Sequence, residues 1–127
     1  MLRYWLPLAI YAGLIGLQSS FPSPAIAPPF PMADKAVHVL LYSGLGLLFF
    51  RAYRSLGWKN ASAVTMLLSV VSTVLFGLSD EWHQAHVPGR ASELADVAAD
   101  ALGGTLGVLA YWLRFVRGRH LPVTPPD

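Results

Sequence analysis

Ionisable side chains recur at one-turn spacing in two apolar segments of this 127-residue sequence. Asp34, His38 and Tyr42 are four residues apart, and so are Asp96 and Asp100. In a helix, residues four apart lie on one face, so each segment would present a polar stripe. Side chains of these types can position a cation that holds an anionic group, or can move a proton as general acid or base.

The polar segment between the two stripes, residues 79–93, supplies further candidates, and we expect it to form a loop. It contains Glu81 and Gln84, and the turn sequence Pro88-Gly89 comes directly before Arg90. Such a turn would fold Arg90 back toward the stripes.

We expect these side chains to meet in one cluster. Exposing Asp96 or Asp100 to lipid would cost roughly 2.5–3.5 kcal/mol at a helix centre and less near the interface. Both should therefore face the interior of a helix bundle. The candidate ligand-binding residues are Lys35, Arg90, Asp34, His38, Tyr42, Gln84, Asp96 and Asp100. The candidate catalytic residues are Glu81, His38 and Asp96. The alternative is a structural ion-pair network that joins the helix ends.

Signals for metal binding and covalent catalysis are weak. Asp34/His38 and His83/His86 have spacings at which a helix could present metal ligands, but the sequence has no H-E-x-x-H motif. It also has no cysteine and no G-x-S-x-G nucleophile elbow. We therefore expect no metal and no cofactor.

Four apolar stretches must position these residues. They cover about residues 4–20, 36–53, 61–78 and 94–116, each near the roughly 17–25 residues that a helix needs to cross a bilayer core. Hydrophobic residues make up 54% and charged residues 13% of the chain, whereas soluble proteins carry about 25% charged residues. The sequence predicts an all-α integral membrane bundle of four transmembrane helices. It would form a single domain, residues 1–119, followed by a disordered tail at 120–127.

The first apolar stretch has a second interpretation. Arg3, the apolar run and Ala25-Ile26-Ala27 resemble a secretory signal with a cleavage site. Pro28 follows directly, and proline at that position generally blocks cleavage. We therefore favour an uncleaved span.

The basic residues predict the orientation of the bundle. With both termini cytoplasmic, seven of the nine Lys and Arg residues lie on the inner side and two, Lys35 and Arg90, on the outer side. This arrangement satisfies the positive-inside rule. The net charge of +2, without a basic stripe, argues against nucleic-acid binding.

Three motifs in this order resemble the VanZ-like family. They are Asp34-Lys35-x-x-His38-x-x-x-Tyr42, then Asp80-Glu81-x-x-Gln84-x-x-Val87-Pro88-Gly89-Arg90, then Asp96-x-x-x-Asp100-x-x-Gly103-x-x-x-Gly107. The family commonly has Asn at the position of Asp100, so this chain carries an additional acid there. The name-giving member is associated with low-level resistance to the glycopeptide teicoplanin. The resemblance implies the fold, the candidate site and a place in the cell envelope, and it does not specify a reaction.

We expect a multi-pass protein of the bacterial cytoplasmic membrane that binds an anionic lipid-linked or cell-wall-related ligand. Lys35 and Arg90 would contact phosphate or carboxylate. The alternatives are a membrane enzyme that acts on a lipid-linked substrate, with Glu81 or His38 as general acid or base, and a structural or partner-binding subunit. Membrane lipids are the expected partners, and the small-residue spacing Gly103-x-x-x-Gly107 permits a homodimer.

Overall fold

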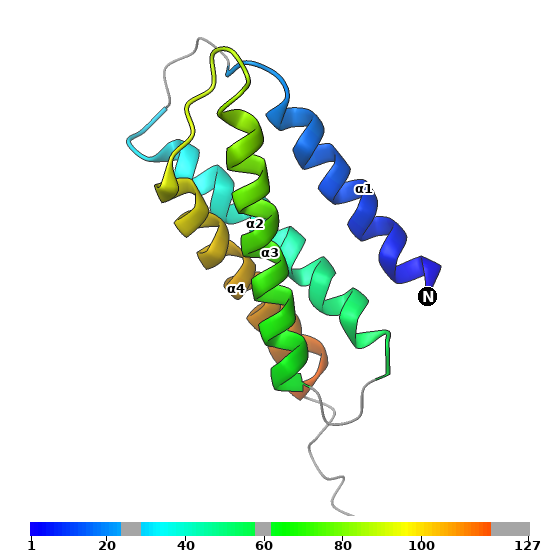
Figure 1. Cartoon of the computed structure of the whole chain (residues 1–127). Coiled ribbons are helices and arrows are strands. Elements are labelled where there is room, and N and C mark those ends of the chain that lie inside the picture. Colours follow the sequence, from blue (N-terminus) through cyan, green and yellow to red (C-terminus); the bar gives the residue numbers. More distant parts are fainter. Residues whose placement is uncertain (24–28, 58–61, 118–127) are drawn as a thin grey trace, which may run out of the picture.

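Four antiparallel helices follow one another along the chain in the computed structural model, which describes residues 1–23, 29–57 and 62–117 (Figure 1). They are α1 (Leu2–Ser19), α2 (Ala33–Arg54), α3 (Ser62–Gln84) and α4 (Leu94–Phe115). The described residues contain no strand. The predicted all-α architecture is therefore confirmed for this part of the chain.

The helices do not contribute equally to the core. Helices α2, α3 and α4 pack against one another, whereas α1 contacts α2 and α3 but not α4 within the described residues. Leu8 and Ile15 of α1 are buried against Tyr42 and Leu45 of α2. Helix α1 is therefore a peripheral helix beside a three-helix centre (Figure 1).

The burial pattern of α3 is the reverse of that of a soluble helix. Its buried line consists of small or polar residues, namely Thr65, Ser69, Thr73, Gly77, Asp80, Glu81 and Gln84. Large apolar side chains such as Leu67 and Leu75 point outward. The Ser69 and Thr73 hydroxyls donate to backbone carbonyls one turn earlier, so their burial leaves no donor unpaired. Small inward and large outward residues are typical of helices that pack within lipid.

Helices α2 and α4 cross in close contact because glycines form the contact. A Cβ atom on Gly103 or Gly107 would overlap the backbone carbonyl of Val39 or Ser43 on α2. The Gly103-x-x-x-Gly107 spacing therefore forms a close contact between two helices of the same chain, α2 and α4. A homodimer through the same glycines stays a prediction.

Three helices, α2, α3 and α4, are long and apolar enough to cross a membrane. Helix α1, with 18 residues, is not among them. The expected four-helix membrane bundle is thus confirmed as a helical bundle with three helices able to span. The fourth span and the cytoplasmic placement of both termini stay predictions.

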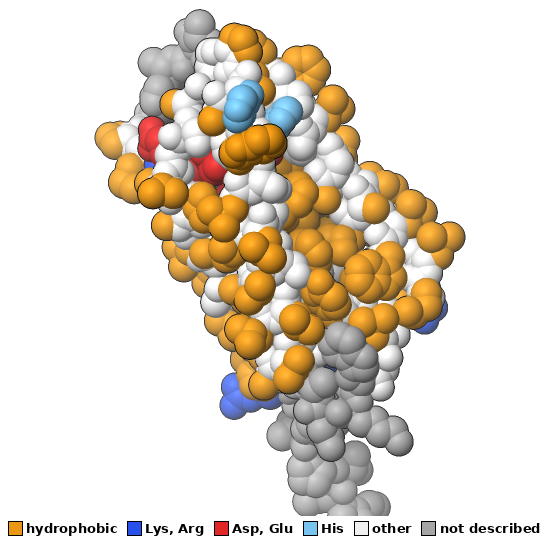
Figure 2. Space-filling model, in the orientation of Figure 1, with side chains coloured by type: hydrophobic (Ala, Val, Ile, Leu, Met, Phe, Trp, Pro, Cys, Tyr) orange, Lys and Arg blue, Asp and Glu red, His pale blue; other side chains and the backbone are white. Residues whose placement is uncertain are grey.

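Charge separates along the long axis of the molecule. Figure 2 shows acidic and histidine side chains at the upper end, and Lys and Arg side chains mainly at the lower end. Arg51, Arg54 and Arg114 lie in the last turns of α2 and α4, at the lower end. We call the upper end the acidic end and the lower end the basic end.

The prediction that residues 79–93 form a loop was partly wrong. Helix α3 continues through Gln84, six residues beyond the span expected at 61–78. Because Gln84 donates to Asp80 one turn earlier, this polar stretch is stabilised as helix. The loop begins only after Gln84. The tail predicted at 120–127 and the motif Ala25-Ile26-Ala27 lie outside the described residues.

Candidate functional site

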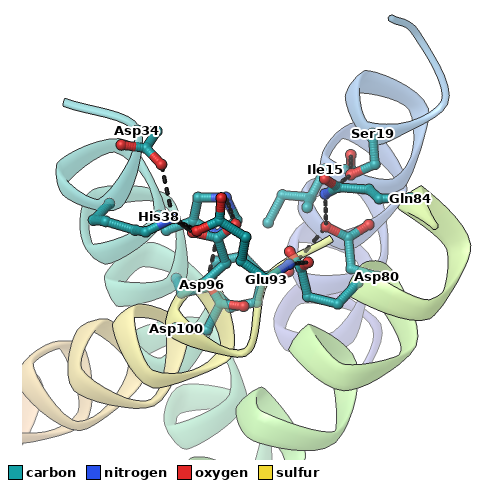
Figure 3. A network of polar contacts seen from close by, with 12 residues as sticks. Ile15, Ser19, Asp34, His38, Asp80, Gln84, Glu93, Asp96 and Asp100 are labelled. Carbon is teal, nitrogen blue, oxygen red and sulfur yellow. Dashed lines mark hydrogen bonds and ion pairs between the residues drawn. The ribbon is translucent and has the colours of Figure 1, made fainter. Parts of the chain in front are cut away.

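The acidic end brings together side chains from all four helices. Figure 3 shows Asp34, His38, Glu93, Asp96 and Asp100 around the facing ends of α2 and α4, and Ser19, Gln84 and Asp80 beside them at α1 and α3. We call the whole set, with Lys35, Tyr42, Glu81 and Arg90, the polar cluster. It divides into parts with different roles.

Lys35 is surrounded by carboxylates. Its Nζ lies 2.8 Å from Asp34 Oδ2, 2.7 Å from Glu93 Oε2 and 2.5 Å from Asp96 Oδ1. The Asp34 and Glu93 side chains are 59% and 53% exposed, whereas that of Asp96 is 8% exposed. Exposed ion pairs contribute little to stability, so the buried Asp96 is the partner that depends most on Lys35.

His38 is held by a buried acid from another helix. Its Nδ1 lies 2.8 Å from Oδ1 of Asp100, whose side chain is fully buried. An ionised carboxylate can only accept, so with Asp100 ionised Nδ1 is the donor, and in the neutral form of the ring Nε2 then keeps its electron pair. Nε2 lies 3.9 Å from Asp96 Oδ2. Gly77 makes room for Asp100, because a Cβ at Gly77 would lie 2.5 Å from Asp100 Oδ2.

Glu81 is buried, and only one of its two carboxylate oxygens accepts a hydrogen bond from the part of the chain that the structure describes. Its Oε2 accepts the backbone N–H of Glu93 at 2.9 Å. Its Oε1 has no hydrogen-bond partner among the described residues, and the same holds for Asp100 Oδ2. Buried polar atoms are nearly always paired, so unpaired carboxylate oxygens on two residues of one cluster suggest a missing ligand.

Asp80 belongs to a structural part of the cluster. It accepts from the Tyr42 hydroxyl at 3.2 Å and from Gln84 Nε2 at 3.0 Å, and Gln84 also reaches Ser19 of α1 at 3.4 Å. This network joins α1, α2 and α3. The Tyr42 ring is stacked parallel to His38, with ring centroids 6.0 Å apart, so the network also supports the histidine.

Arg90 is tied to α1. Its Nε donates to the Phe21 carbonyl at 2.7 Å and its Nη2 to the Gln18 carbonyl at 2.9 Å. A guanidinium can add charge-assisted hydrogen bonds to the carbonyls at a helix C-terminus in this way. The predicted return of Arg90 toward the cluster is therefore seen, and its bonded partners are backbone carbonyls.

A pocket of about 160 Å³ lies between α1, α2 and α3 beside the cluster. Its apolar lining comes from Ile15, Val37 and Leu41. Its polar lining comes from Gln18, Asp34, His38, Tyr42, Asp80, Gln84 and Arg90. A cavity with both linings suits the junction between a polar headgroup and a lipid chain.

The structure places all the candidate ligand-binding residues at the acidic end but assigns them to two places. Asp34, His38, Tyr42, Gln84 and Arg90 line the pocket, whereas Lys35, Asp96 and Asp100 lie outside its lining. The candidate catalytic residues Glu81, His38 and Asp96 come together. One ligand atom from each lies within 4.8 Å of the others.

Sequence reasoning missed two contributors. Glu93 pairs with Lys35 and also donates its backbone N–H to Glu81. Ser19 of α1 accepts from Gln84. The acid at the start of α4 was a usable signal for Glu93, whereas no spacing in the sequence indicates Ser19.

Negative charge is in excess in the cluster. Six carboxyl groups, those of Asp34, Asp80, Glu81, Glu93, Asp96 and Asp100, face two permanent cations, Lys35 and Arg90. A structural network does not need this excess. The arrangement can bind a cation, or exchange a proton through His38 and Glu81.

Comparison with known proteins gives the family of the chain. The family description VanZ/LLP1 matches residues 5–116. An uncharacterized protein of Schizosaccharomyces pombe is 32% identical over 129 residues, covering 94% of this chain and 76% of that protein. No solved structure matches the chain. With three helices able to cross a membrane and a family match over residues 5–116, the chain is a membrane protein that belongs to the VanZ/LLP1 family.

Proposed function

We propose that this protein binds the headgroup of an anionic lipid-linked ligand in the pocket at its acidic end. The observation that carries the proposal is the mixed lining of that pocket. Ile15, Val37 and Leu41 offer an apolar wall, and Arg90 and His38 lie at the polar side. A lipid-linked molecule presents the same change from apolar to polar at the membrane surface.

Arg90 is the residue that would contact the anionic group. A guanidinium has five N–H groups, and the two hydrogen bonds to the α1 carbonyls leave the others for phosphate or carboxylate. Lys35 is less suited to this role, because three carboxylates surround its Nζ. Of Lys35 and Arg90, both predicted to contact the anionic group, the proposal therefore retains Arg90 as the direct contact.

The biological setting forms part of the same proposal. The family resemblance makes lipid-linked cell-wall intermediates and glycopeptide resistance the first to test. A bacterial cytoplasmic membrane stays a prediction, because a relative occurs in fission yeast.

Native mass spectrometry of the full chain in detergent tests the binding. The probes are undecaprenyl phosphate and dioleoylphosphatidic acid, with dioleoylphosphatidylcholine as the zwitterionic comparison. The basic end has a pocket of its own, lined in part by Arg51 and Arg54. All proteins in the comparison therefore carry Arg51→Ala and Arg54→Ala.

Two variants address the pocket in different ways. Arg90→Ala removes the anion contact, and Val37→Trp fills the apolar side. We expect Arg90→Ala to weaken binding of the anionic probes at least about tenfold, because one charge-assisted contact is lost. Val37→Trp should also weaken binding, because the indole occupies the apolar side of the pocket. Val64→Trp, at another exposed valine of a membrane-facing helix, should bind like the parent. Unchanged binding by both folded pocket variants would refute the proposal.

A second function is favoured by one observation. His38 is oriented by Asp100, and the nearby Glu81 has an unpaired oxygen, which is an arrangement suited to general acid–base catalysis on a lipid-linked substrate. This function predicts release of phosphate from the same probes, measured by ³¹P NMR. Glu81→Gln would abolish the release and leave binding intact. No release by the unmodified chain would exclude this second function for these substrates.

A further inference from the structure

The three candidate catalytic residues have the composition of a metal site. His38 comes from α2, Glu81 from α3 and Asp96 from α4, and one donor atom of each lies within 4.8 Å of the others. Donors on an ion at 2.0–2.2 Å are about 3–3.5 Å apart. The observed positions therefore need only a small contraction to coordinate one ion. Because the ligands come from three helices, their spacing in the sequence gives no metal motif.

We infer that His38, Glu81 and Asp96 bind one divalent transition-metal ion of the Zn²⁺ or Mn²⁺ type. Imidazole nitrogen together with carboxylate oxygen suits these ions, whereas Mg²⁺ and Ca²⁺ prefer oxygen ligands alone. Three protein ligands leave at least one coordination position for an outside group.

The unpaired oxygen of Glu81 supports the site independently of the ligand spacing. Glu81 is 5% exposed, and its Oε1 is buried without a hydrogen-bond partner among the described residues. An ionised carboxylate is costly to bury in this state. A cation beside Glu81 would supply the missing partner.

Asp100 completes the geometry of a metal-bound histidine. Histidine ligands usually donate their second ring N–H to a carboxylate or carbonyl, which fixes the tautomer and ring orientation. His38 Nδ1 lies 2.8 Å from Asp100 Oδ1, as such a bond requires, and its Nε2 lies 3.9 Å from Asp96 Oδ2. His38 is thus prepared to bind an ion through Nε2. The pair His83/His86 is no second candidate, because both histidines are exposed and neither belongs to a group of three possible metal ligands among the described residues.

The ion also explains how an anion could approach a cluster rich in carboxylates. Six carboxyl groups against two permanent cations make the approach of a phosphate less favourable. A divalent ion reduces that excess and offers an open position to an anionic oxygen. This role as a bridge rests on the proposed function, whereas the binding of the ion does not.

Calorimetry on the full chain tests the inference without lipid probes. The protein is purified in detergent, freed of any affinity tag, treated with EDTA, and titrated with ZnCl₂ and MnCl₂. We expect one ion per chain. His38→Ala and Glu81→Gln should each bind at least about tenfold more weakly, and His86→Ala, the matched control, should bind like the unmodified protein.

Circular dichroism checks that the variants keep their helices, and Glu81→Gln preserves the size of the side chain. Electron spin-echo spectroscopy of the Mn²⁺-loaded unmodified protein needs no variant and should show a directly bound imidazole nitrogen. Three results would each overturn the inference. They are the absence of stoichiometric binding, binding by both variants that is as tight as in the unmodified protein, and a loss of binding in His86→Ala alone.

The two proposals can fail separately. Unchanged probe binding by a chain that binds no metal would overturn the metal site and leave headgroup binding in place. Metal binding without probe binding would support the site and refute the proposed function.

Discussion

His38 Nδ1 and Asp100 Oδ1 form a hydrogen bond 2.8 Å long that crosses the contact between α2 and α4. The two helices lie close there because Gly103 and Gly107 bring their backbones together. The histidine is therefore positioned by backbone packing as well as by its acid. A polar site held by packed helices keeps its geometry better than a site on loops.

Two replacements of Asp100 distinguish its role as a hydrogen-bond acceptor for His38 from its role as a negative charge. Asp100→Ala leaves the partly buried His38 N–H without its acceptor, which should lower the free energy of unfolding by about 1 kcal/mol or somewhat more. Asp100→Asn keeps an acceptor oxygen and should lose less. Unfolding in SDS–detergent mixtures, followed by circular dichroism, measures both. An Asn variant as unstable as the Ala variant would contradict the prediction.

The three carboxylates around Lys35 should contribute differently to the free energy of unfolding. Asp34→Asn and Glu93→Gln remove exposed partners and should change the free energy of unfolding by less than about 1 kcal/mol. Lys35→Met leaves the buried Asp96 without its cation and should cost about 3–5 kcal/mol. Adding Asp96→Asn to Lys35→Met should recover part of that loss. A double-mutant cycle on unfolding measures the coupling, and strict additivity would show that Asp96 does not depend on Lys35.

The close α2–α4 contact predicts a strong dependence on glycine at position 107. A Cβ on Gly107 would overlap the Ser43 carbonyl, so Gly107→Ala should push the helices apart and cost about 1–3 kcal/mol. Gly13→Ala on α1 is the matched control, because a Cβ there meets nothing within 4 Å. Alanine favours helix over glycine, so this control should be neutral or slightly more stable. Equal losses in thermal unfolding would show that helix packing is not the cause.

The orientation in the membrane can be measured because the chain has no cysteine. Single cysteines replace His86 at the acidic end, and Leu2 and Ser62 at the basic end, all of them exposed. A membrane-impermeant maleimide should label the first in intact cells and the other two only after permeabilisation. Labelling of Leu2→Cys together with His86→Cys would show that α1 does not cross the membrane.

The helices were predictable because bilayer burial makes composition informative. Four apolar stretches matched four helices, and only the end of α3 was misplaced, since its polar last turns resemble a loop in composition. The motif spacing also correctly grouped Asp34 with His38 and Asp96 with Asp100 on shared faces. Local periodicity carries this information because a helix repeats every 3.6 residues.

Contacts between helices were much harder to predict. Nothing in the sequence states that His38 forms its hydrogen bond with Asp100 and not with Asp96, or that Lys35 pairs with three carboxylates. These pairings depend on the rotation and depth of α2 against α4, which the glycine contact sets. The same reason explains why the His38, Glu81 and Asp96 group was not recognised as a possible metal site.

The separation of acidic and basic side chains to opposite ends makes the folded chain an electric dipole along the membrane normal. In the predicted orientation, a transmembrane voltage that is negative inside attracts the basic end inward and favours the acidic end outside. Each elementary charge that crosses the full field is worth about 2.3 kcal/mol per 100 mV. An energised membrane would therefore reinforce the insertion direction that the positive-inside rule predicts.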